Sequence, residues 1–135
     1  MATPFTLEII TPERQFFKGE VESVSFPTTN GRIEIMAHHI PMVAALEVGV
    51  LRIRTGEEVR EAFSSEGFLE VRPDETLLFV QACEWPEEID LRRAEEAKRR
   101  VEERLARERS AHDRASLARA LARLQLGQRR NNPNM

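Results

Sequence analysis

The chain has 135 residues, of which 41% are hydrophobic and 32% charged, and its formal net charge is −3. This length supports one modest hydrophobic core with a smaller appendage and excludes two full-sized domains. No run approaches the roughly 20 apolar residues that span a bilayer, and residues 1–17 lack the pattern of a secretory signal. We therefore expect any membrane contact of this chain to be indirect.

The charge is divided unevenly along the chain. Residues 1–89 hold 7 Lys and Arg against 16 Asp and Glu, a net charge of −9. Residues 90–135 hold 13 Lys and Arg against 7 Asp and Glu, a net charge of +6. The two ends of the chain are therefore expected to interact with partners of different charge.

Short apolar–polar alternation, broken by turn residues, runs from Phe5 to about Val80. Turn signals at roughly 8 to 12 residue spacing separate these segments, which is typical of an all-β sandwich or barrel. We predict that residues 1–85 form such a domain from several short antiparallel strands. The alternating segments are Phe5–Ile9, Val24–Phe26, Ile33–Ile35, Leu51–Ile53 and Leu69–Val71, followed by the continuous apolar run Thr76–Val80.

Helical periodicity replaces the alternation after Pro86. Because proline cannot donate to a strand ladder or continue a helix, residues 86–89 are predicted to form a hinge. Asp90 is placed to cap a first helix, whose apolar residues recur three or four positions apart. These residues are Leu91, Ala94, Ala97, Val101 and Leu105.

A second helix follows an interruption at Arg109–Asp113. Asp113 can cap it, Leu117, Leu121 and Leu124 form its apolar face, and Gly127 is expected to end it. Residues 90–127 are thus predicted to form a two-helix hairpin, and residues 128–135 a disordered tail. The seam is rich in alanine and gains little free energy against the entropy of ordering. We expect a marginal hairpin that folds onto the β domain or opens and docks elsewhere.

Three segments, Thr11–Ile53, Ser64–Glu84 and Ile89–Ala94, carry a family resemblance. They resemble stretches of the epsilon subunit family of bacterial F-type ATP synthases. Thr11–Ile53 is similar to that family's strand-and-turn run, with His39 and Pro41 as its His-x-Pro. Ser64–Glu84 is similar to its Gly-Phe-Leu-Glu-Val segment, and "IDLRRA" (Ile89–Ala94) to its Ile/Leu-Asp-x-x-Arg-Ala motif. The resemblance covers about residues 5–126.

At three turns the chain differs from the residues that are common in the family. The family commonly has a second glycine where this chain has Glu34, Pro-Gly where it has Ala37-His38, and Ser-Gly-Gly where it has Ser65–Gly67. These changes leave the expected fold intact but alter the surface around Gly31–Pro41.

The resemblance implies a non-catalytic subunit on the rotating central stalk of a proton-translocating ATP synthase. It implies contacts with the gamma subunit, the c-ring, and the alpha and beta subunits of the catalytic head. The protein would be peripheral, on the cytoplasmic side of a bacterial inner membrane. Its C-terminal helices would extend into the head and block ATP hydrolysis, which requires a bistable element. Contacts with the c-ring or gamma are implied for Gly31, Arg32, His39 and Pro41.

The "IDLRRA" segment has two interpretations. From spacing alone it is a capped helix start with solvated arginines. The resemblance implies instead half of an ATP site, in which arginines from both helices bind the phosphates by charge-assisted bonds. ATP would then be a regulatory ligand, and no cofactor is required. The implied ATP-binding residues are Glu84, Ile89, Asp90, Arg93, Ala94, Arg100, Arg119 and Arg123.

The basic run at residues 105–130 holds 7 Lys and Arg against 2 acidic residues. It fits a solvated helix face or a nucleic-acid surface, and the family implies attraction to an acidic segment of the beta subunits. Nucleic acid is disfavoured because residues 1–89 are acidic and no aromatic residue follows Trp85. Trp85 itself is interpreted as a core plug under the hinge or a partner contact.

No catalytic or metal-binding arrangement is evident. The single cysteine, Cys83, excludes an internal disulfide, favours a reducing compartment, and follows an apolar run as a structural thiol does. His38 and His39 lack a third metal ligand at a recognisable spacing. We expect no catalysis by the chain itself. The alternative to a stalk subunit is a free-standing β-sandwich binding module with a basic helical tail.

Overall fold

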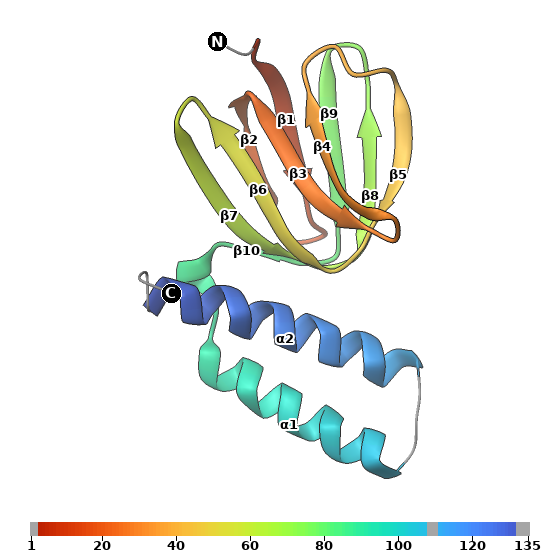
Figure 1. Ribbon diagram of the computed structural model, residues 1–135, viewed down its shortest axis with the longest axis vertical. Coiled ribbons are helices and arrows are strands. Elements are labelled where there is room, and N and C mark those ends of the chain that lie inside the picture. Colours follow the sequence, from red (N-terminus) through yellow and green to blue (C-terminus); the bar gives the residue numbers. More distant parts are fainter. Residues whose placement is uncertain (1–2, 108–110, 132–135) are drawn as a thin grey trace. The chain divides into compact units, whose positions relative to one another are not determined.

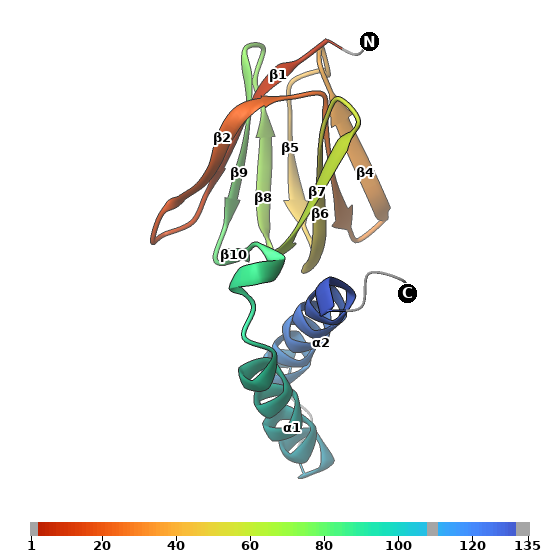
Figure 2. The ribbon, with the colours of Figure 1, turned by 90° about the vertical axis from the view of Figure 1, so that its left-hand side faces the viewer.

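The computed structural model describes residues 3–107 and 111–131. The chain divides into two compact units, Met1–Glu84 and Trp85–Met135, which we call the sandwich and the helical unit. Figures 1 and 2 show the strands of the first and the paired helices of the second. The predicted fold class, an all-β domain followed by a helical hairpin, is confirmed.

The sandwich is built from two five-stranded sheets. Sheet A has the order β2-β1-β9-β8-β5, and sheet B the order β10-β7-β6-β3-β4. The strands are β1 (Phe5–Ile10), β2 (Gln15–Val21), β3 (Ser23–Thr28), β4 (Gly31–Met36), β5 (Met42–Leu46), β6 (Gly49–Thr55), β7 (Glu58–Ser64), β8 (Gly67–Val71), β9 (Glu75–Val80) and β10 (Cys83–Glu84).

The core lies between the inner faces of the two sheets. Leu7, Ile9, Leu69 and Leu78 of sheet A are fully buried. Sheet B contributes a second set of fully buried side chains, which are Val24, Phe26, Ile35, Leu51, Ile53 and Phe63. Alternation in β1 and β6 sends the intervening residues outward, whereas β7 and β9 contain three consecutive buried residues.

One pairing in sheet A differs from the prediction of antiparallel strands. β1 pairs with β9 in parallel, with Leu7 opposite Thr76 and Ile9 opposite Leu78. Alternation fixes which face of a strand is buried, but it does not encode the direction of a partner that is some 70 residues away. The chain reaches β9 running in the same direction as β1, so these two neighbouring strands pair in parallel.

The helical unit begins with a short 3-10 helix, η1 (Pro86–Glu88), at the predicted hinge. Pro86 occupies its first position, where a missing N–H costs nothing. The Glu88 carboxylate accepts a hydrogen bond from the backbone N–H of Trp85 at 2.9 Å. The segment between the two units is therefore locally ordered by its own residues.

Two helices follow, α1 (Leu91–Arg107) and α2 (Ala111–Asn131), packed as an antiparallel hairpin (Figure 1). The prediction that Gly127 ends the second helix is wrong, because α2 continues to Asn131. Residues 128–131 of the predicted disordered tail are thus helical, and residues 132–135 lie outside the described residues. No helix of the described part of the chain is long and apolar enough to cross a membrane.

The seam between α1 and α2 is made largely of small side chains. Ala94 and Val101 of α1 are buried, as predicted. On α2 the buried residues are Ala120, Leu124 and Leu126, whereas Leu121 is 45% exposed, against the prediction. Leu121 follows the buried Ala120 by one residue, a turn of about 100° around the helix, and therefore lies on another face.

Candidate functional site

The "IDLRRA" segment is first a well-formed helix start. The Asp90 carboxylate accepts a hydrogen bond from the backbone N–H of Arg93 at 3.0 Å, and the Asp90 carbonyl accepts the first helical bond from Ala94. Asp90 is thus the predicted N-cap. Ile89 and Ala94 are buried, with 4% and 5% of their surface exposed, while Arg93 is exposed to solvent.

The four arginines of the predicted nucleotide set share a position relative to the seam. Arg93 and Arg100 on α1 directly precede the buried residues Ala94 and Val101. On α2, Arg119 and Arg123 likewise directly precede the buried Ala120 and Leu124.

Stepping back one residue from a buried seam position turns about 100° around either helix. Since the helices are antiparallel, this turn leads to the same flank of the hairpin on both of them. We therefore assign the four arginine positions to one flank, which we call the arginine flank.

Exposure differs between the two helices of the arginine flank. Arg93 and Arg100 are exposed, whereas Arg119 and Arg123 are half-buried. Arg119 donates a hydrogen bond to the Ser116 hydroxyl at 3.3 Å, which orients its guanidinium. Glu84, the remaining member of the predicted set, is half-buried on β10 of the sandwich and so belongs to the other unit.

The opposite flank of the hairpin carries a groove that the sequence did not predict. Its volume is about 550 Å³, and its lining residues come from both helices. Residues that follow seam positions lie on this flank, but no sequence motif marks it. The groove is lined by Lys98, Leu121, Leu124, Gln125, Gln128 and Arg129, none of which belongs to the predicted nucleotide set.

The predicted partner-contact residues of the sandwich lie at two separate places. Gly31 and Arg32 begin β4, whereas His39 and Pro41 lie in the loop after β4 ends. Six strand residues span about 20 Å, so the structure does not bring the two pairs together. They can serve one partner only if that partner reaches both ends of β4.

Arg32 is fixed across sheet B rather than free in solvent. Its guanidinium donates to the Val50 carbonyl at 2.6 Å and to the Ser25 carbonyl and hydroxyl at 3.2 Å. Burial of the guanidinium lowers the pKa of Arg32, nearby Arg52 lowers it further, and Glu61 opposes both. Arg32 thus links edge strand β4 to β3 and β6.

His38 and His39 lie in the β4–β5 loop as surface residues of a turn, as predicted. His38 adopts the left-handed backbone conformation, with φ of 65°. Both histidines border a hollow of about 190 Å³ that also includes Glu20 and the β8–β9 turn. Within the described residues no cluster of three or more His, Cys, Asp or Glu could hold a metal ion.

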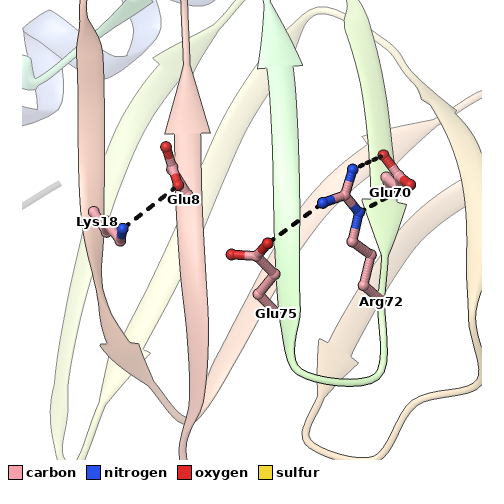
Figure 3. Close-up of polar contacts among 5 residues, drawn as sticks. All are labelled: Glu8, Lys18, Glu70, Arg72 and Glu75. Atoms are coloured by element: carbon pink, nitrogen blue, oxygen red, sulfur yellow. Dashed lines mark hydrogen bonds and ion pairs between the residues drawn. The ribbon is translucent and has the colours of Figure 1, made fainter.

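The outer face of sheet A is divided into a polar half and an apolar half. Lys18 of β2 pairs with Glu8 of β1 at 4.0 Å in the polar half (Figure 3). Arg72, after β8, contacts Glu70 at 3.0 Å and Glu75 at 3.4 Å. The hydrogen bond to Glu70 raises the pKa of Arg72.

The apolar half exposes large side chains to solvent. Phe68 is 50% exposed and Val43 is 71% exposed, on adjacent strands β8 and β5. The Phe68 and Phe79 rings lie 5.2 Å apart and border a hollow of about 340 Å³. Ile10 and Pro12 also line that hollow, together with the polar residues Glu66 and Gln81. Large apolar side chains exposed on one face of a domain are typical of a protein-binding surface.

Comparison with known proteins places both units in one family. Residues 4–86 match the beta-sandwich domain of the ATP synthase delta/epsilon chain. The ATP synthase epsilon chain of Ruminiclostridium cellulolyticum is 44% identical over 134 residues, which cover 96% of this chain and 99% of that protein. The epsilon chain of Caldanaerobacter subterraneus subsp. tengcongensis is 43% identical, with coverage of 93% and 95%.

Solved structures show the same fold at low sequence identity. A chain of the Euglena gracilis mitochondrial ATP synthase, in a structure of its OSCP/F1/c-ring, has a TM-score of 0.67 and 17% identity, covering 98% of this chain and 82% of its own. A chain from the central stalk/c-ring of the Tetrahymena thermophila enzyme has a TM-score of 0.56 and 16% identity, covering 65% and 71%. With a matching sandwich domain and relatives aligned along both units, the chain belongs to the family of ATP synthase epsilon chains.

Proposed function

We propose that this chain is a non-catalytic rotor subunit of a proton-translocating ATP synthase, which couples the catalytic head to the c-ring and restrains ATP hydrolysis through its helices. The observation that carries the proposal is the 44% identity to an ATP synthase epsilon chain across almost the whole length of both proteins. A free-standing binding module would need to match only the sandwich. The proposed location is peripheral, on the cytoplasmic side of a bacterial inner membrane.

The sandwich supplies the attachment to the rotor. Its exposed apolar half of sheet A, around Phe68, Phe79 and Val43, offers the kind of surface that a permanent protein partner buries. We assign this face to the gamma subunit. The two ends of β4, marked by Arg32 and His39, are separate from it and leave a second contact for the c-ring. Fixed in this way, the sandwich would rotate with both partners.

The helical unit supplies the regulation. Its seam buries few large side chains, so its open and closed states differ by only a small free energy, as a switch requires. Its net positive charge attracts it to acidic surfaces of the alpha and beta subunits when it opens. In that position it would obstruct the rotation that ATP hydrolysis drives.

ATP is the proposed ligand of the closed state. Like charges on the arginine flank repel one another, and a polyphosphate offsets this repulsion through charge-assisted hydrogen bonds. Arg93 and Arg100 would bind from α1, and Arg119 and Arg123 from α2. Ile89 and Ala94 are already buried beside them, so the adenine would contact the edge of this apolar pair.

Affinity purification from bacterial membranes tests the rotor role. The tagged chain should recover gamma, alpha and beta in constant proportion, and Phe68→Glu should lose gamma while the purified variant keeps its β-sheet circular dichroism signal. Val59→Glu is the matched control, because Val59 is also about half exposed but lies on β7 of the other sheet. Reproducible absence of gamma, alpha and beta would favour the free-standing module.

Isothermal calorimetry tests the nucleotide site. The intact chain should bind ATP saturably and in preference to ADP, and the double variant Arg93→Ala/Arg123→Ala should abolish the heat. The control is Arg92→Ala/Arg114→Ala, which removes the same charge from the same helices at exposed positions outside the set. If both double variants lose binding equally, the effect is one of net charge and no specific site exists.

A further inference from the structure

Gly127 is buried inside α2, close to the start of α1. A Cβ atom added to it would lie 2.4 Å from Leu91 Cδ2 and 3.3 Å from Leu91 Cγ, with Ile89 Cγ2 at 3.5 Å. Real Cβ atoms essentially never approach another heavy atom as closely as 2.4 Å, so any larger residue at position 127 requires the end of the flexible Leu91 side chain to move away. The missing side chain therefore leaves a socket in which the Leu91 side chain lies.

Glycine is an unfavourable choice at this position for α2 taken alone. In a helix interior, glycine lowers the equilibrium constant for helix formation by about fivefold relative to alanine. The glycine lies four residues before the end of α2 and does not end it. Its benefit to the fold is thus the close approach of α2 to Leu91 and Ile89.

The two ends of the hairpin are held by different chemistry. At the end near the connecting loop, Arg104 of α1 contacts Asp113 of α2 at 3.1 Å through an exposed guanidinium. At the other end, where α1 begins, the contact is the apolar socket. The ion pair is polar and open to solvent on its Arg104 side, where screening by water weakens it, whereas the socket is a purely apolar contact.

We propose that Gly127 and Leu91 form the clasp that keeps the hairpin closed, so that the size of the side chain at position 127 sets the balance between closed and open helices. Opening of the clasp frees Ile89 and Leu91 and uncovers the first turn of α1. The clasp rests on the proposed regulatory function only for its effect on hydrolysis, since the contact itself involves neither nucleotide nor partner.

Hydrogen–deuterium exchange on the full chain, without nucleotide, tests the clasp. Helix propensity alone predicts that Gly127→Ala raises the protection of α2 by about fivefold. The clasp predicts the opposite sign, a loss of about threefold to tenfold in both helices, because the added methyl group expels Leu91 from the socket. Peptides of the sandwich serve as the internal control and should remain unchanged.

A double-mutant cycle between Gly127 and Leu91, with control substitutions at Gln125, distinguishes the clasp from helix propensity. Leu91→Ala should lower protection in the wild-type chain, but in the Gly127→Ala background it should restore part of the loss, because the two groups that clash are then both small. Gln125→Gly and Gln125→Ala, at an exposed position of α2, measure the helix propensity difference without the socket.

The exchange data distinguish the clasp from a simple effect of helix propensity. A loss of protection in Gly127→Ala that Leu91→Ala partly reverses supports the clasp. A gain equal to the difference between the two Gln125 variants, or purely additive effects of Gly127→Ala and Leu91→Ala, overturns it. A chain that fails to bind ATP leaves this result unaffected, so failure of the nucleotide proposal and failure of the clasp are distinguishable.

Discussion

Gly67 begins β8 at a point where the backbone of β9 leaves no room for a side chain. A Cβ atom there would lie 2.1 Å from the Phe79 carbonyl oxygen and 2.9 Å from Val80 Cα. Because these are backbone atoms of a paired strand, a rotamer change cannot relieve the overlap. Glycine is thus required by β8–β9 pairing, independently of turn geometry.

We predict that Gly67→Ala destabilises the sandwich by about 3 kcal/mol, the upper range for overpacking. Gly56→Ala is the control, because Gly56 has a φ of 64° but open space around it, so it should lose only about 1 kcal/mol from strain. Urea unfolding followed by the β-sheet circular dichroism signal measures both. Equal losses would show that steric overlap at Gly67 is not the cause.

His38 carries strain that its neighbours do not. Its φ of 65° lies in the left-handed region that glycine adopts freely. His38→Gly should therefore leave stability unchanged or raise it by up to about 1 kcal/mol. His38→Val should lower stability by about 1 to 2 kcal/mol, because a β-branched residue fits this conformation poorly.

Thermal unfolding checks the His38 pair. For a domain of this size 1 kcal/mol corresponds to a shift of about 4 to 8 °C in melting temperature. His38 is exposed, so neither substitution removes a packed side chain. The difference in melting temperature between the two variants therefore reflects backbone strain alone. A valine variant as stable as the glycine variant would mean that the loop adopts another conformation in solution.

At the scale of the secondary-structure elements, the first turn of α1 depends on Asp90. Its carboxylate accepts the Arg93 backbone N–H, so Asp90→Ala should cost the helix about 1 kcal/mol. Asp90→Asn and Asp90→Ser keep the cap and should cost less than half of that. Hydrogen exchange of the amides of residues 91–94 measures the loss.

The same three variants separate the structural role of Asp90 from a nucleotide role. If Asp90→Asn keeps the cap but weakens ATP binding as much as Asp90→Ala does, the carboxylate charge acts on the ligand. If only Asp90→Ala weakens binding, its contribution is to the helix start alone.

Sequence patterns predicted the features that depend on contacts between neighbouring residues. They missed the features that depend on contacts between residues far apart in the chain. The Asp90 cap was predictable because donor and acceptor are three residues apart. The parallel direction of β9 against β1 was not, since nothing local encodes it. Gly127 was mistaken for a helix end because glycine usually serves there, whereas its contact with Leu91 required the fold. Periodicity placed Arg93 with Arg100, and Arg119 with Arg123, on a shared face of each helix, but the groove on the opposite flank carried no motif.

At the scale of the whole molecule, the two units differ in how much apolar surface they bury. Of the buried hydrophobic side chains in the described residues, 18 belong to the sandwich and 6 to the helical unit. Because these 6 include two alanines, the helices gain little from burial against the entropy of ordering. The sandwich should therefore hold its fold alone, and the helices should not.

Separate expression of the two units tests this difference. Residues 1–84 should unfold cooperatively, with a melting temperature within about 5 °C of the intact chain, because every buried sandwich contact is kept. Residues 85–135 should lose most of their circular dichroism signal at 222 nm at a much lower temperature than the sandwich unfolds, since helices of this length are marginal when the seam between them buries few large side chains. Stable helices in the isolated fragment would contradict the marginal seam, and the energy needed to open the clasp would then exceed what a regulatory switch allows.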